Sequence, residues 1–218
     1  MVTQSEENYL KSIYHLGKLG SITVSTNAIA DKMETKASSV TDMLKKLAEK
    51  ELVDYRKYQG VSLTSEGKIL AANVIRKHRL WEVFLVEKLN FTWDEVHDVA
   101  EQLEHIKSIK LINELDAFLE FPTQDPHGDP IPDGEGNIEK FQKIHLSQVN
   151  QSVNCYCIGV KDSSDNFLRY LDKSNIAIGT EIQVLSKESF DASMTVKIND
   201  SELTISKEIA GNIYIKFS

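Results

Sequence analysis

Residues 37–64 have the sequence ASSVTDMLKKLAEKELVDYRKYQGVSLT, and three patterns follow one another along it. The first is a set of apolar residues with the i, i+3, i+4, i+7 spacing of a helix that buries one face, namely Val40, Met43, Leu44 and Leu47. After Leu52 come a short strand pattern, a basic turn and a returning strand pattern. This stretch therefore predicts a helix over about residues 37–50 followed by a β-hairpin.

Two helical patterns precede this stretch, over residues 5–19 and from about residue 25 to 33. The order of helix, short helix, helix and basic hairpin is typical of a winged helix-turn-helix, which reads DNA with its third helix. Hydroxyls and basic groups bind phosphates and base edges, so the outer face of the third helix and the wing supply the candidate DNA contacts. These are Lys36, Ser38, Ser39 and Thr41 on the helix and Arg56, Lys57 and Tyr58 in the wing.

The charge distribution agrees with a DNA-binding module attached to something else. The chain as a whole has a net charge of −8. Residues 1–80 hold 13 basic and 9 acidic residues, whereas the remaining 138 hold 12 and 24. A basic N-terminal part before an acidic remainder is expected when only the first part contacts nucleic acid.

A long helix is predicted over residues 65–89, and its apolar residues are too widely spread for one packing face. Surplus apolar surface of this kind suggests a dimer seam. Another helix is predicted over about residues 108–120.

Between these helices, residues 92–105 read TWDEVHDVAEQLEH and contain a candidate metal site. Thr92 and Glu95 have the spacing of a capping box, which predicts that a helix begins at Thr92. On that helix two imidazoles and two carboxylates would share one face, namely His97, Glu101, Glu104 and His105. His78 and Glu82 form a second pair at i, i+4 on the preceding helix. Imidazole and carboxylate groups on neighbouring helices are the ligands of divalent transition metals.

The rest of the chain predicts a boundary and a β domain. All four prolines lie between Pro122 and Pro132 among several glycines, which indicates a linker. After about residue 148 the short alternating runs predict a small β-barrel of about five strands. With only Cys155 and Cys157, no apolar run long enough for a membrane span and no signal peptide at the N-terminus, we expect a cytoplasmic protein without membrane contact.

Two other functions are open from these residues. A di-metal carboxylate enzyme is one, but such helical sites commonly use Glu-x-x-His on each of two helices, and Glu101-x-x-Glu104-His105 differs. The other is a winged-helix regulator that responds to a small molecule and keeps only vestigial metal residues. DNA binding measured with and without metal separates these readings from a metal-responsive regulator, for which we expect no enzymatic activity.

The combined pattern resembles the diphtheria-toxin-repressor (DtxR/MntR) family of metal-dependent transcription regulators. The resemblance rests on IADKM, SSVTDMLKKLAEKELV, LTSEGK, KHRLWE, VHDVAEQLEH and DPHGDPIP. It implies a mainly α fold with a β part, in three domains. These are a winged helix-turn-helix over 1–64, a helical metal-binding and dimerisation domain over 65–140, and an SH3-like (FeoA-like) β-barrel over 148–218.

The resemblance also divides the candidate ligands between two metal sites. His78, Glu82 and His97 match an ancillary site, to which the third domain contributes in some members; Asp165, or Asp162, is the candidate here. Glu101, Glu104 and His105 match the primary site, together with Asn8 of the first helix. Lys11 stands where binuclear manganese members have an acidic residue.

The resemblance implies a homodimeric repressor that binds a double-stranded DNA operator when loaded with metal. Glu101 stands where manganese-type members have glutamate and iron-type members cysteine, which favours Mn²⁺, with Fe²⁺ as the alternative. Metal bound to both the first helix and the dimerisation helix would set the spacing of the two reading helices in the dimer.

Overall fold

The computed structural model describes residues 2–138, 143–150 and 152–217. They form two compact units. The first comprises Met1–Trp81, Ala100–Leu115 and Ile131–Glu139, and the second comprises Glu82–Val99, Asp116–Pro130 and Lys140–Ser218. The boundary passes through the helical middle of the chain, so that each unit takes part of it.

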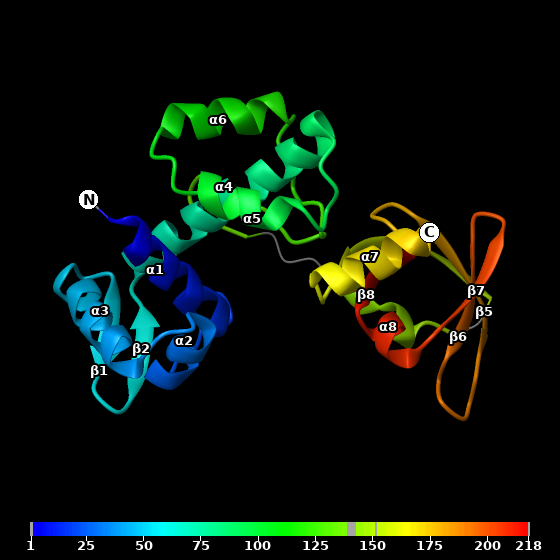
Figure 1. Cartoon of the computed structure of the whole chain (residues 1–218), viewed down its shortest axis with the longest axis horizontal. Helices are drawn as coiled ribbons and strands as arrows, with labels where there is room; N and C mark the ends of the chain where they lie inside the picture. The colour runs from blue at the N-terminus through cyan, green and yellow to red at the C-terminus, as the bar shows by residue number, and fades with distance from the viewer. Residues whose placement is uncertain (1, 139–142, 151, 218) are drawn as a thin grey trace. The chain divides into compact units, whose positions relative to one another are not determined.

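The N-terminal part of the first unit has the element order that the sequence predicts (Figure 1). It contains α1 (Gln4–Leu16), α2 (Thr26–Lys32), α3 (Ala37–Glu49), β1 (Val53–Arg56) and β2 (Gly60–Leu63). Val40, Leu44 and Leu47 of α3 are fully buried, which confirms the predicted apolar face. The hairpin is antiparallel, with Val53 opposite Leu63. The outer face of α3 and the turn of the hairpin are therefore left for a partner.

Three helices follow the hairpin, and one of them begins later than predicted. They are α4 (Ser65–Leu89), α5 (Val96–Leu103) and α6 (Ile109–Phe118). The predicted helix start at Thr92 is wrong. The Thr92 hydroxyl donates to Asp94 at 2.6 Å, and residues 93–95 form a turn. Half of the capping box remains, since the Thr92 backbone N–H donates to the Glu95 carboxylate at 3.1 Å.

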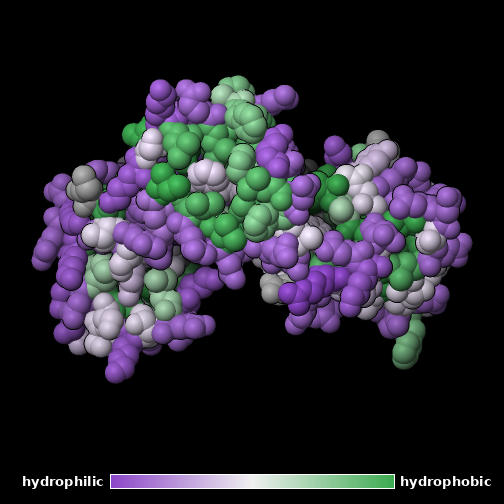
Figure 2. Space-filling model, turned by 45° about the horizontal axis from the view of Figure 1, so that its top comes forward, coloured by the Kyte–Doolittle hydropathy of each residue, from purple (hydrophilic) through white to green (hydrophobic). Residues whose placement is uncertain are grey.

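The helical part leaves apolar side chains in solvent. Ile109 is 78% exposed and Phe118, on the same helix, is 61% exposed. Figure 2 shows hydrophobic residues, in green, gathered on the face of this part that is turned to the viewer. On α4 itself most apolar residues are buried within the chain, and Ile69 and Leu89 are the ones left exposed. A dimer seam along α4 stays a prediction, and α6 offers the larger exposed apolar surface.

The proline-rich segment is an ordered loop and not a simple linker. Asp125 and His127 are both buried, and the Asp125 carboxylate accepts hydrogen bonds from the backbone of His127 and Asp129. The backbone of this loop also pairs with β4 (Val153–Val160), since the Val160 N–H donates to the His127 carbonyl at 2.9 Å. Proline and glycine composition alone could not reveal this packing.

The C-terminal part of the second unit is one antiparallel sheet with two short helices (Figure 1). Its strands lie in the order β3-β8-β4-β5-β6-β7. Besides β4 they are β3 (Ile144–His145), β5 (Glu181–Lys187), β6 (Met194–Ile198), β7 (Ser201–Ile205) and β8 (Ile213–Phe217). The five longer strands are those predicted. The added elements are β3, the 3-10 turn η1 (Leu146–Gln148), and the helices α7 (Asp165–Lys173) and α8 (Lys207–Gly211).

The core of this second unit also takes up Trp93, which packs with the buried residues of the sheet. Cys155 and Cys157 are both buried in it, and burial raises the pKa of each thiol to about 11. They act as small apolar side chains. Among the described helices, none combines the length and the apolar character that a bilayer crossing needs.

Candidate metal centre

Polar side chains from α1, α4 and the end of α5 meet in the first unit. Lys11 of α1 stands at the centre. Its ammonium nitrogen lies 2.5 Å from Oε1 of Glu101 and 2.6 Å from Oε2 of Glu104. It is also 3.4 Å from Nδ1 of His78. Nδ1 of His78 is in turn 2.7 Å from the same Oε2 of Glu104. A cation thus sits among two carboxylates and an imidazole.

Glu104 and His105 lie just beyond the end of α5. The helix ends at Leu103, although the Glu104 N–H still donates to the Ala100 carbonyl at 2.8 Å. The expectation that four ligands share one face of a single helix is therefore corrected, because the last two stand on a turn. This turn brings His105 to α1, where Nδ1 of His105 lies 2.6 Å from Oε2 of Glu7. Glu7 therefore fixes the orientation of the imidazole.

Two polar atoms of this cluster, Oε1 of Glu104 and Nε2 of His105, are buried without a hydrogen-bond partner, and so is Oδ1 of Asn8 on α1. Buried polar atoms are nearly always paired, because leaving one unpaired costs about 1–3 kcal/mol. Glu104 is fully buried, and its Oε1 lies 3.6 Å from Nε2 of His105. Asn8 precedes Lys11 by three residues and so shares a face of α1 with it.

The chemistry of these three atoms suits a divalent cation. Each can offer a lone pair, and His105 does so at Nε2 when Nδ1 carries the proton shared with Glu7. Ligand atoms around one such ion lie about 3 Å apart, close to the separation of the Glu104 and His105 atoms. The donor set of carboxylate, amide and imidazole suits first-row divalent metals.

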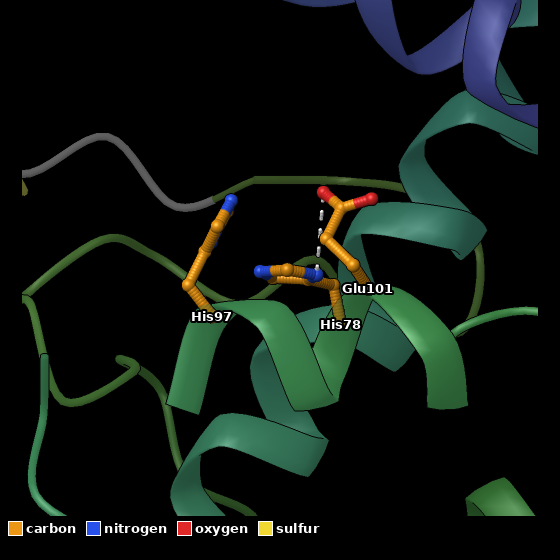
Figure 3. A group of neighbouring side chains, drawn as sticks. All are labelled: His78, His97 and Glu101. Carbon is orange, nitrogen blue, oxygen red and sulfur yellow. Dashed lines mark ion pairs between the residues drawn. The ribbon is translucent and has the colours of Figure 1, made fainter. Parts of the chain in front are cut away.

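The remaining predicted ligands lie along α4 and α5. His97 and Glu101 stand one turn apart on α5, and Figure 3 shows them with His78 of α4, which pairs with Glu101 at 4.0 Å. In the second unit, Nδ1 of His97 lies 3.6 Å from Oε1 of Glu82. Glu82 is itself one turn after His78 on α4. These four residues therefore lie on helices, as the sequence predicts.

Glu82 also belongs to a buried cluster that the sequence did not assign. Ligand atoms of Glu82, Asp125 and His127 lie within 4.8 Å of one another, and all three residues are buried. Nε2 of His127 lies 2.8 Å from the Trp93 carbonyl and donates to it. Its Nδ1 lies 3.8 Å from Oε2 of Glu82. Burial alone would lower the pKa of His127, but the neighbouring Glu82 carboxylate raises it to about 9.

We predict that this imidazolium makes the metal-free protein less stable at alkaline pH. The pKa of His127 is about 9 in the folded chain and 6.5 at its ordinary value. A protonated His127 therefore contributes its full stabilisation of the fold below pH 6.5, and this contribution is lost as the pH rises through 9. The free energy of unfolding of the second unit should fall by about 3 kcal/mol over that range.

Urea unfolding at pH 6.5, 8 and 9.5, followed by tryptophan fluorescence, measures this change. Trp93 stacks on His127 with ring centroids 6.3 Å apart, so its emission reports the right region once the other tryptophan, Trp81, is replaced by phenylalanine. His127→Gln keeps a donor for the Trp93 carbonyl but cannot titrate. It should flatten the profile, and an unchanged profile in that variant would contradict the assignment.

The proposed ligand of the third domain cannot be placed in the same way. The side chain of Asp165 lies outside what the structure describes, although its backbone begins α7. Asp162, the other candidate, accepts a hydrogen bond from the Ser164 N–H at 2.9 Å. That bond caps a turn and says nothing of metal.

The candidate DNA contacts lie on exposed parts of the first unit. Lys36, Ser38 and Ser39 are exposed at the start of α3. The Thr41 hydroxyl donates to the Ala37 carbonyl at 2.9 Å, which leaves its lone pairs free to accept. Tyr58 at the tip of the hairpin is 93% exposed, and the Lys57 ammonium lies 4.9 Å from its ring.

Sequence reasoning missed Glu7 and the central position of Lys11. Glu7 meets His105 across 98 residues, and Lys11 meets Glu104 across 93. No local spacing signals contacts of this range. For Asp125 and His127 a signal existed, because DPHGDPIP stood out in the sequence, but it did not indicate a partnership with Glu82.

Comparison with known proteins covers nearly the whole chain in three parts. Residues 1–61 match the model of the iron dependent repressor, N-terminal DNA binding domain. Residues 64–133 match the iron dependent repressor, metal binding and dimerisation domain, and residues 144–216 match the FeoA domain. The expected fold class is thereby confirmed.

Individual relatives agree with these matches. The diphtheria toxin repressor of Corynebacterium diphtheriae is 25% identical over 99% of this chain and 98% of its own length. A solved manganese-dependent transcriptional repressor in complex with manganese is 33% identical, with a TM-score of 0.81, over 98% of this chain and all of that chain. The manganese regulator SloR is 36% identical, with a TM-score of 0.70, over 98% of both chains. The chain therefore belongs to the DtxR/MntR family of metal-dependent transcriptional repressors, with a DNA-binding domain and a metal-binding and dimerisation domain.

Proposed function

We propose that this chain is a cytoplasmic, manganese-responsive repressor that binds a double-stranded DNA operator as a metal-loaded homodimer. The observation that carries the proposal is the set of three buried atoms without a hydrogen-bond partner on Asn8, Glu104 and His105. They come from α1 of the DNA-binding part and from the turn after α5. An ion held by all three ties those two parts together.

The chain's own residues are arranged to support this link. Glu7 holds the His105 ring through Nδ1 and so leaves Nε2 free to bind metal. Lys11 and His78 engage Oε2 of Glu104 and leave Oε1 free. When bound, a divalent cation supplies the positive charge that these lone pairs need. Loss of that charge leaves the three atoms unpaired, which favours separation of α1 from the turn.

Movement of α1 would reach the DNA-reading helix directly. Oε1 of Glu6 on α1 lies 2.7 Å from the ammonium of Lys50, the C-cap residue of α3. Burial raises the pKa of the Glu6 carboxyl, but its hydrogen bonds with Lys50 and Thr3 outweigh burial and hold this pKa below its usual value. The pair keeps α1 and α3 together, so that the position of α1 sets the spacing of the two α3 helices in a dimer. That spacing must match half-sites about one DNA turn apart.

Manganese is favoured over iron by the donor atoms. The carboxylate oxygen of Glu104 and the amide oxygen of Asn8 are hard ligands, which suit Mn²⁺, while the imidazole of His105 suits Fe²⁺ as well. Buried Cys155 and Cys157 lie in the sheet of the second unit, far along the chain from these residues. Fe²⁺ is therefore the alternative ion.

We also propose the ancillary site of His78, Glu82 and His97, with Asp165 as its ligand from the third domain. Support comes from the Glu82–His97 distance of 3.6 Å and from the one-turn spacing of His78 and Glu82. The domain limits 1–64, 65–140 and 148–218 belong to the same proposal.

The test is DNA binding by the purified protein with Mn²⁺, with Fe²⁺ under anaerobic conditions, and with a chelator. A promoter fragment from next to the protein's own gene serves as probe, and a scrambled fragment of equal length serves as control. We expect Mn²⁺ to raise the affinity at least tenfold, consistent with a coupling of about 1–3 kcal/mol. Equal affinity in all three conditions would refute metal responsiveness and favour the small-molecule alternative.

The wing gives a further prediction. Arg56 is exposed at the end of β1, and a side chain there neutralises backbone phosphate without reading bases. Arg56→Ala should therefore weaken binding similarly on specific and scrambled DNA and reduce the salt slope by about one. Fluorescence anisotropy between 50 and 300 mM salt measures both effects. A loss confined to the specific fragment would place Arg56 at a base edge instead.

A further inference from the structure

We propose that Lys11 is a built-in cation that occupies the position among His78, Glu101 and Glu104 where a second divalent ion would otherwise bind. It thereby limits this cluster to one exchangeable ion, held by Asn8, Glu104 and His105. The inference rests on the proposed function, because it divides the same cluster into an exchangeable and a fixed cation.

The contacts of Lys11 are those of a bound ion. Its ammonium donates to two carboxylate oxygens at 2.5 and 2.6 Å. It also lies 3.4 Å from Nδ1 of His78, which itself donates to Oε2 of Glu104. Two carboxylates and an imidazole are also a common ligand set for manganese and iron. The Lys11 side chain is 14% exposed and Glu104 is fully buried, whereas Glu101 is 37% exposed, so little water reaches the contact with Glu104. Charges in such a place must be compensated from within the protein.

Room and charge both exclude a second divalent ion while Lys11 is in place. A metal ion would bind the same oxygens at about 2.0–2.1 Å, inside the volume that the ammonium fills. With the exchangeable ion already bound at Glu104, a second divalent ion beside the ammonium would also bring the positive charges to five, facing two carboxylates. The singly charged lysine instead leaves one carboxylate charge uncompensated, and that charge is available to the ion at Oε1 of Glu104.

Lys11 also selects which oxygen of Glu104 faces the exchangeable ion. Because Oε2 is engaged by Lys11 and by His78, Oε1 is the atom left without a partner. Lys11 is therefore a positioning residue for the primary site as well as a substitute for a second ion.

The decisive variant is Lys11→Glu, which removes the fixed cation and adds a carboxylate. Mn²⁺ binding is measured by equilibrium dialysis and by electron paramagnetic resonance of the loaded dimer. We expect the variant to bind one more Mn²⁺ per chain than the wild type, with the broadened signal of two neighbouring, magnetically coupled ions. Lys173→Glu, the same charge change at an exposed residue of α7, should leave stoichiometry and signal unchanged.

A second variant guards against failure of Lys11→Glu to fold. Lys11→Gln is closer in size and leaves both carboxylates without the ammonium. We expect the metal-free variant to unfold at a lower urea concentration than the wild type and to gain more stability than the wild type on addition of Mn²⁺. Unchanged stoichiometry in Lys11→Glu, a coupled pair already in the wild type, or wild-type stability of metal-free Lys11→Gln would overturn the proposal.

These outcomes are separate from failure of the proposed function. If the wild type binds DNA equally well with Mn²⁺ and with chelator, the repressor mechanism fails whatever the stoichiometry. If it responds to Mn²⁺ but Lys11→Glu gains no ion, only the role of Lys11 is refuted.

Discussion

Replacing Glu104 with glutamine should weaken Mn²⁺ binding at least about 100-fold and remove the stimulation of DNA binding by metal. The change keeps the size of the side chain and removes its negative charge. Loss of a residue that only supports a ligand already costs about 10–100-fold in metal affinity, and Glu104 offers an unpartnered oxygen of its own. Isothermal titration with Mn²⁺ and DNA binding by anisotropy measure the two effects.

The physical reason lies in the position of Glu104 between two cations. Its Oε2 accepts from Lys11 at 2.6 Å, and its side chain is fully buried. With a neutral amide there, Lys11 keeps only Glu101 as its carboxylate partner and faces the site as a poorly compensated positive charge. That charge repels an incoming divalent ion, in addition to the loss of the ligand itself.

A matched control separates this effect from general damage. Glu202→Gln makes the same chemical change at an exposed residue of β7 and should alter neither metal binding nor DNA binding. Size-exclusion chromatography should show an unchanged dimer for both variants, because Glu104 contacts residues of its own chain. A Glu104→Gln protein that responds to Mn²⁺ like the wild type would show that Glu104 is not a ligand.

Local patterns in the sequence located the helices well because their causes are local. The apolar face of α3 follows from the spacing of Val40, Leu44 and Leu47, and the structure buries all three. The helix start at Thr92 failed for an equally local reason. The Thr92 hydroxyl donates to Asp94 at 2.6 Å, residues 93–95 form a turn, and the helix begins only at Val96.

In the candidate site, too, contacts between residues close in sequence could be predicted, whereas contacts between distant residues could not. The sequence predicts His97 and Glu101 on one helix, since they are one turn apart. It does not reveal that Lys11 lies within 2.6 Å of Glu104 or that Glu7 orients His105. Lys11 stood out only as a basic residue where an acidic one was expected. In the folded chain the positive charge of Lys11 is compensated by Glu101 and Glu104. Only the tertiary structure could show these contacts.

The second large effect is expected from a substitution of Gly128, which lies in the proline-rich loop that the sequence predicts to be a linker. Gly128→Ala should destabilise the second unit by about 3–5 kcal/mol. Gly128 has a φ of +81°, and a Cβ at this position would lie 2.0 Å from the Ile158 carbonyl oxygen and 2.4 Å from Cα of Gly159. Both neighbours belong to backbone and cannot turn aside as a side chain could. The loop would have to leave β4.

Leaving β4 would also disturb the buried cluster next to Gly128. The His127 carbonyl accepts from the Val160 N–H at 2.9 Å, and the His127 ring pairs with Glu82 at 3.8 Å. We therefore expect the variant to lose the alkaline pH dependence of unfolding together with its stability. Urea unfolding followed by the fluorescence of Trp93, which stacks on His127, measures both.

Gly179→Ala is the matched control for this prediction. Gly179 has a similar φ of +86°, but a Cβ there meets nothing within 4 Å. It therefore carries only the backbone cost of a left-handed conformation, about 1–2 kcal/mol. The difference between the two variants isolates the contact between the loop and β4. If both variants lose the same stability, the Gly128 loop does not pack on β4, and the segment is the simple linker that its proline content suggested.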